Sequence, residues 1–138
     1  MQLKKLQSRI EKLIKKHNII LDKLFLVPDM QQFLDSEGIT EENQDRLGRT
    51  FSKADGHTVI IFKDNIIKKE TKSVLGFIIY NFSIEEYKKL TRIKPFILHL
   101  ILHEIAHAKN IHEEKDADNW AFQNLDQEYR YFWHEPIK

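Results

Sequence analysis

Two histidines and a glutamate stand at the spacing of a metal site on a helix. The segment reads His103-Glu104-Ile105-Ala106-His107. Residues four apart lie on the same face of a helix, so both imidazoles can reach one ion. Neutral imidazole suits Zn²⁺, and a catalytic zinc site has three protein ligands and one open position. Glu104 lies between the two ligands and does not share their ion readily, so we expect it to accept a proton from a water molecule at the metal.

A third ligand is expected downstream of this motif. Glu114 follows His107 by seven residues and begins the run EKDADNWA. On a helix, Glu114 and Asp118 share one face with two alanines, which allow close packing. Glu114 can complete a set of two histidines and one glutamate, while Asp118 can accept the free N–H of a ligand histidine.

The pattern HEIAH followed by ExxADxWA resembles the gluzincin metallopeptidases, most nearly the ImmA/IrrE-like family. The resemblance covers about thirty residues, 96–125. It implies that His103 and His107 bind zinc, with Glu114 as the third ligand. It also implies that Glu104 is the general base and that Asp118 orients a ligand. The implied protein is a zinc metallopeptidase with a zincin-like fold, acting on a protein or peptide substrate. Only a tight turn separates His107 from Glu114.

His112 is the alternative third ligand, five residues beyond His107. A histidine after HExxH is the pattern of the metzincin and SprT-like proteases, although the metzincin glycine is missing here. If His112 is the ligand, the expected function is that of a SprT-like protease associated with nucleic acid.

A second alternative is a regulatory or protein-binding module that contains the metal but has no peptidase activity. Such a module would dock its partner through a basic first helix or an aromatic tail. His99, one turn before His103, is expected to be a hydrogen-bonded core or rim histidine, with a role as extra ligand or substrate contact as the alternative.

The composition sets the class of protein. The chain has 138 residues, no cysteine and a formal net charge of +1. This length suits one domain over residues 1–138. The near-neutral charge argues against nucleic acid as a partner, and no apolar run is long enough to span a membrane. Without cysteine there are no disulfides and no thiolate zinc ligands, which is compatible with the cytoplasm that we expect.

The elements that must position the motif predict a small, mainly helical α+β domain. We expect the metal helix after Pro95, a second helix over 113–125, and a β-hairpin made of 57–63 and 74–82 beside them. A strand edge next to the metal would pair with an extended peptide.

The remaining segments predict further helices. We expect an amphipathic helix over 2–16, short helices capped by Asp29 and Ser83, and a weak helix that is capped by Thr40 and runs to about residue 50. The tail, residues 128–138, is aromatic and is expected to pack on the core. Its polar members, Tyr129, Arg130 and His134, are candidates to stabilise an oxyanion.

Overall fold

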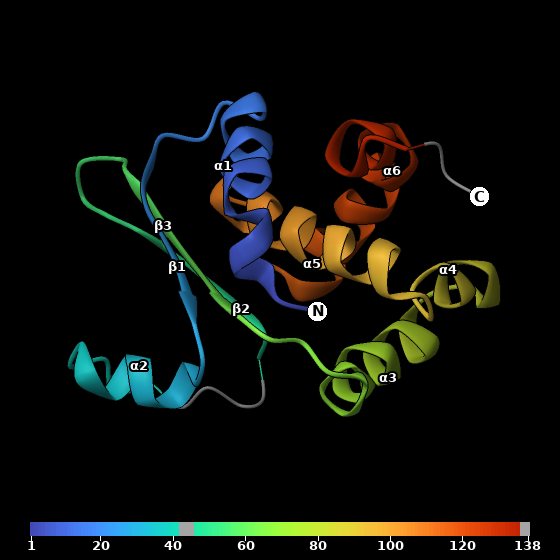
Figure 1. Cartoon of the computed structure of the whole chain (residues 1–138), viewed down its shortest axis with the longest axis horizontal. Coiled ribbons are helices and arrows are strands. Elements are labelled where there is room, and N and C mark those ends of the chain that lie inside the picture. The colour runs from blue at the N-terminus through green and yellow to red at the C-terminus, as the bar shows by residue number, and fades with distance from the viewer. Residues whose placement is uncertain (42–45, 136–138) are drawn as a thin grey trace.

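The computed structural model describes residues 1–41 and 46–135, and it has an α+β architecture with a small mixed sheet. The strands are β1 (Leu21–Val27), β2 (Gly48–Ser52) and β3 (Thr58–Lys63). Their order is β1-β3-β2, with β1 parallel and β2 antiparallel to β3. β2 is therefore an edge strand, and Figure 1 shows most of the helices on one side of the sheet.

The side chains of β3 alternate between two apolar clusters, as a strand covered on both faces requires. Ile60 and Phe62 belong to the main core, which also holds α1 (Gln7–Lys16). Ile61 points to the other face and packs in a small cluster with α2 (Met30–Ser36). The sheet is thus buried on both sides around its central strand.

The main core is built around α5 (Ile93–Ala108), which contains the HExxH motif. Every residue of α5 from Pro95 to Ala106 is buried. The helix packs against β2 on one side and against α6 (Glu114–Trp133) on the other. This burial holds the motif on a rigid element.

A tight turn joins α5 to α6 and explains how α6 can begin so soon. Asn110 has a φ of 69°, in the left-handed region that asparagine tolerates better than most residues. The N–H of Ile111 donates to the carbonyl of Ala106 at 3.1 Å, and the N–H of Asn110 donates to that of His107 at 3.0 Å. These bonds close the helix in the manner of a Schellman motif.

The predicted hairpin is wrong in its second strand. Residues 74–82 were expected to pair with 57–63, but α3 (Lys72–Asn81) is a helix. The run is apolar without a period-two alternation, and such a run does not distinguish a strand from a helix. β3 pairs instead with β2, whose first residues fall in the segment predicted as a weak helix capped by Thr40. That prediction is wrong for residues 46–50, and residues 42–45 lie outside the described part of the chain.

Several local predictions are confirmed. The Asp29 carboxylate accepts the N–H of Gln32 at 2.9 Å and caps α2. Ser83 and Glu86 form a capping box at the start of α4 (Ile84–Lys89). The first helix is present, with a 3-10 turn over Leu3–Leu6 preceding α1.

The C-terminal helix is longer than predicted. α6 was expected to end near residue 125, but it continues to Trp133. Tyr129, Phe132 and Trp133 are buried, which confirms that the tail packs on the core. Within the described ranges, no helix has the length and apolar character needed to cross a membrane.

Candidate metal centre

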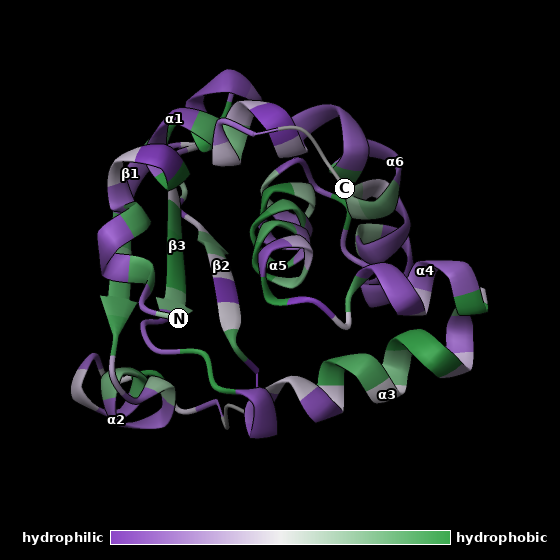
Figure 2. Ribbon diagram, turned by 45° about the vertical axis from the view of Figure 1, so that its right-hand side comes forward, coloured by the Kyte–Doolittle hydropathy of each residue, from purple (hydrophilic) through white to green (hydrophobic). Residues whose placement is uncertain are grey.

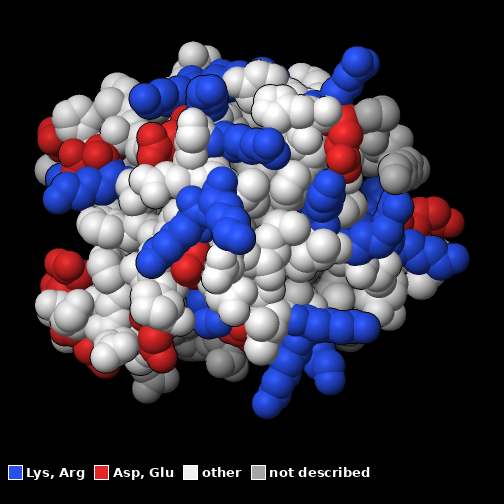
Figure 3. All heavy atoms as spheres, in the orientation of Figure 1, with Lys and Arg blue, Asp and Glu red and all other residues white. Residues whose placement is uncertain are grey.

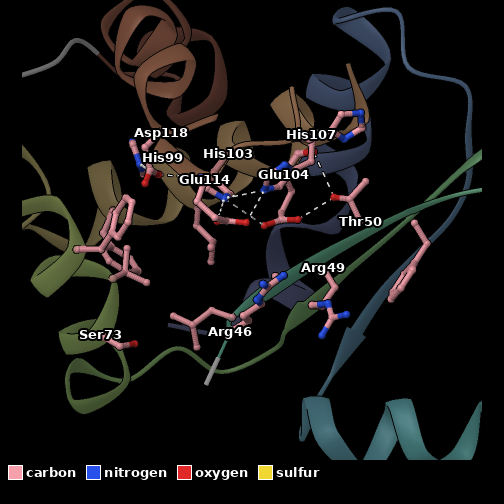
Figure 4. Close-up of a pocket in the computed structure, with 18 of the residues that line it drawn as sticks. Arg46, Arg49, Thr50, Ser73, His99, His103, Glu104, His107, Glu114 and Asp118 are labelled. Atoms are coloured by element: carbon pink, nitrogen blue, oxygen red, sulfur yellow. Dashed lines mark hydrogen bonds and ion pairs between the residues drawn. The ribbon is translucent and has the colours of Figure 1, made fainter. Parts of the chain in front are cut away.

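Three potential ligand atoms converge where α5 meets the start of α6. The Nε2 atoms of His103 and His107 lie 3.0 Å apart. The Glu114 carboxylate lies 2.9 Å from Nε2 of His103 and 3.2 Å from Nε2 of His107. Figure 4 shows these side chains pointing toward one another from the two helices. The structure therefore brings together the three residues that the sequence proposes as ligands.

The donor set fits a zinc ion. Atoms bound at about 2.0–2.1 Å around a tetrahedral ion are separated by about 3.3 Å, close to the spacing found here. The other ring nitrogen of each histidine, Nδ1, already makes a hydrogen bond within the protein. Nδ1 of His103 lies 2.7 Å from Asp118 Oδ1, and Nδ1 of His107 lies 2.8 Å from the carbonyl of Ile111. Since carbonyls and carboxylates accept, both Nδ1 atoms carry protons and both Nε2 atoms are left for a metal.

The electrostatics of this cluster favour positive charge at its centre. Although burial lowers the pKa of His103, its hydrogen bonds with Asp118 and Glu114 raise that pKa to about 10. Burial also lowers the pKa of His107, but the opposing effects, of which the hydrogen bond with Glu114 is the largest, together outweigh it, and the net result is a raised pKa. The two histidines in turn hold the pKa of the Glu114 carboxyl well below its usual range. A cation bound among these groups would meet a carboxylate that is already ionised.

Glu104 lies beside the candidate ligands and is held by β2. The hydroxyl of Thr50 donates to Glu104 Oε1 at 2.7 Å, while Oε2 lies 4.0 Å from Nε2 of His103. Gly48 leaves room for this side chain, because a Cβ there would lie 2.8 Å from the Cγ of Glu104. One carboxylate oxygen of Glu104 thus accepts a hydrogen bond from the strand, and the other lies near His103.

Sequence reasoning missed this role of β2. Gly48 and Thr50 are more than fifty positions from Glu104 in the chain, and no spacing pattern links them to the motif. Only the packing of β2 on α5 brings them together.

A cleft of about 730 Å³ opens at the cluster. β2 lines one side, and α3 with the first half of α5 lines the other, through side chains such as Val74, Phe77 and Leu100. His112 also lines the cleft, but among the described residues it belongs to no group of converging ligand atoms. The tail residues considered for an oxyanion role, Tyr129, Arg130 and His134, are not among its lining residues.

Comparison with known proteins finds no match: no family model, no curated protein and no solved structure matches this chain. The functional argument therefore depends on the site itself.

Proposed function

We propose that this chain is a zinc-dependent metallopeptidase with a zincin-like domain, similar to the ImmA/IrrE-like gluzincins. It would hydrolyse a peptide bond in a protein or peptide substrate. The observation that carries the proposal is the convergence of two Nε2 atoms and a carboxylate beside Glu104, in a cleft bordered by a strand edge.

In this proposal His103, His107 and Glu114 hold the zinc ion. When bound, zinc lowers the pKa of water and polarises a carbonyl group. Glu104 is the general base: with Oε1 held by Thr50, its Oε2 is left to accept a proton from the attacking water. The same carboxyl group then delivers that proton to the leaving amine.

The substrate is expected to bind as an extended chain along β2. One edge of β2 pairs with β3, and residues 48–52 also line the cleft. An unpaired strand edge can accept main-chain hydrogen bonds from a peptide without reading its sequence. The side chains of α3 and α5 would then contact the residues of that peptide.

The alternative functions find less support in the geometry. A SprT-like site needs His112 at the metal, but Glu114 is the residue within 3.2 Å of both histidines. Figure 3 shows Lys and Arg side chains spread over the visible face rather than gathered in one stripe. The aromatic tail, a candidate docking surface for a binding module, is largely buried, and Lys16 of the basic helix pairs with the buried Glu128 at 2.9 Å.

The first experiment measures the metal content of the purified chain. We expect one zinc per chain in the wild type and in His112→Ala, and loss of zinc in His103→Ala and Glu114→Ala. Glu113→Ala is the matched control for Glu114→Ala, since it removes the neighbouring carboxylate only. Zinc retained in Glu114→Ala but lost in His112→Ala would transfer the third ligand to His112 and support the SprT-like alternative.

The second experiment tests the peptidase activity of the zinc-loaded chain. The zinc-loaded chain is incubated with a library of peptides from a digested proteome, and new peptide termini are identified by mass spectrometry. Glu104→Gln should retain zinc and lose cleavage. A chain that binds zinc but produces no new termini would contradict the peptidase proposal and favour a metal-containing binding module.

A further inference from the structure

His99 is a buried histidine that lies one helical turn before His103 on α5. It is 1% exposed, and its Nε2 lies 2.8 Å from Oδ1 of Asp118. Nδ1 of His103 lies 2.7 Å from the same oxygen. Figure 4 shows Asp118 next to His99, with His103 beyond them. One carboxylate oxygen of α6 thus accepts N–H groups from two histidines of α5.

Asp118 is the polar partner that His99 has within the described residues. The other ring nitrogen of His99, Nδ1, is buried and makes no hydrogen bond among the described residues. The ring otherwise packs on Phe122, with ring centroids 4.4 Å apart. A buried polar atom without a partner is costly, and an apolar side chain would avoid that cost in this helix. The bond to Asp118 is therefore what the imidazole contributes.

We propose that His99 is a positioning residue for the metal centre and acts through Asp118. The two N–H donors hold Oδ1 of Asp118 between them, and Asp118 in turn fixes the ring of His103 with Nε2 toward the metal. The inference depends on the metal centre of the proposed function, but it does not depend on peptidase activity.

Loss of the His99 bond would loosen the support of a ligand. Asp118 is 5% exposed, so little water is available to replace a lost donor. With one donor in place of two, its carboxylate can rotate, and the ring of His103 loses part of its fixed orientation. Outer partners of this kind typically change metal affinity by about 10–100-fold. His99 is one bond further from the metal, and its effect should be smaller.

The experiment measures zinc affinity by competition with a chromophoric chelator. Asp118→Asn should weaken affinity by about 10–100-fold, and His99→Phe by about three- to tenfold. The double variant His99→Phe/Asp118→Asn should bind zinc no more weakly than Asp118→Asn alone, since His99 acts through Asp118. His99→Gln, whose amide N–H can still reach Asp118, should bind zinc within about twofold of the wild type.

Matched controls separate positioning from packing. Phe122→Leu disturbs the ring contact of His99 but leaves its hydrogen bond, and should keep wild-type affinity. His99→Asn stays polar but is too short to reach Asp118, and should behave like His99→Phe. If the His99→Phe variant does not fold, the comparison of His99→Gln with His99→Asn still separates positioning from packing.

If the wild type binds zinc, three results would overturn the inference. The first is wild-type zinc affinity in both His99→Phe and His99→Asn. The second is a double variant whose loss of zinc binding free energy equals the sum of the losses in the two single variants. The third is a second zinc per chain that is lost with His99, which would make His99 a ligand together with the nearby atoms of His103 and Asp118. A wild type that binds no zinc would refute the metal centre and this inference alike. A wild type that binds zinc but cleaves nothing would refute only the peptidase, and the affinities would still decide the role of His99.

Discussion

The helices α5 and α3 flank the same cleft and are both rich in aliphatic residues, but they are buried to opposite extents. Figure 2 shows hydrophobic residues along both. Every residue of α5 from Pro95 to Ala106 is buried, whereas in α3 the buried residue is Ile78. Ile79 and Tyr80 of α3 are 53% and 89% exposed. Similar composition therefore produces a core helix in one place and a surface helix in the other.

The difference follows from the neighbours of each helix. α5 lies between the sheet and α6, while α3 contacts chiefly α4 and the 3-10 helix over Lys68–Thr71. A helix that carries the proposed metal ligands must hold them in one geometry, and burial on all sides achieves this. A helix that lines the open side of a cleft has no such requirement. We therefore expect α5 to determine stability and metal binding, and α3 to affect the contact with substrate.

The largest expected effect is on global stability. Ile101 of α5 is fully buried, so Ile101→Ala should lower the free energy of unfolding by about 2–5 kcal/mol, because it leaves a cavity. Ile79→Ala on α3 is the matched control and should change it by less than about 1 kcal/mol. Urea denaturation of both variants measures the contrast. Equal losses would show that α3 is held as firmly as α5.

The next effect is the pH dependence of the metal-free chain, which probes the charge cluster of α5 and α6. The pKa of His103 is raised from its ordinary 6.5 to about 10. Its protonated form therefore stabilises the fold fully below pH 6.5, and this contribution is lost as the pH rises toward 10. We therefore expect the free energy of unfolding of the metal-free chain to fall across this range.

The acid side of this profile has the opposite sign. The pKa of Glu114 is lowered from its ordinary 4.5, so its contribution is present above pH 4.5 and is lost as the pH falls below it. Thermal unfolding of metal-free protein from pH 3 to 10 measures both limbs. Zinc-loaded protein should not lose stability between pH 6.5 and 10, because the ion replaces the proton. A metal-free His103→Gln variant that keeps the alkaline slope would contradict the assignment.

A smaller effect is expected from the β2 side of the cleft. Gly48→Ala places a methyl group against the side chain of Glu104 and should displace it. We expect about a tenfold lower kcat, equivalent to about 1.4 kcal/mol in activation free energy, with zinc content unchanged. Steady-state kinetics on a peptide identified from the library gives the measurement. Unchanged kcat would show that Glu104 adjusts without loss of its function.

The smallest effect is expected at the exposed face of α3. Tyr80→Ser should change the free energy of unfolding by no more than about 0.5 kcal/mol, since the side chain is 89% exposed.

Phe77→Ser, at a residue of α3 that lines the cleft, should leave zinc affinity unchanged. It should alter which peptides of the library are cleaved. An unchanged cleavage pattern would remove α3 from the substrate contacts.

The prediction of strands from the sequence failed where tertiary contacts decide. The aliphatic run over 74–82 has strand-forming residues, yet it is helical as α3. β2 is short and weakly apolar, yet it pairs with β3, with Phe51 opposite Val59 and Thr50 opposite Ile60. Strand propensity depends on such neighbours more than helix propensity does.

The local part of the site can be read from the amino-acid sequence. A period of 3.6 residues places His103 and His107 on one face of α5, and the same period aligns Glu114 with Asp118 on α6. These relations hold within single helices, so they can be read without a fold.

The way the two helices meet, and the other residues that reach the motif, depend on the packing of the fold. The α5–α6 turn brings Glu114 to the histidines, and the packing of β2 on α5 places Thr50 against Glu104. The bond that joins His99 to Asp118 likewise crosses from α5 to α6. These contacts depend on the packing of elements distant in the chain, and no local periodicity encodes it.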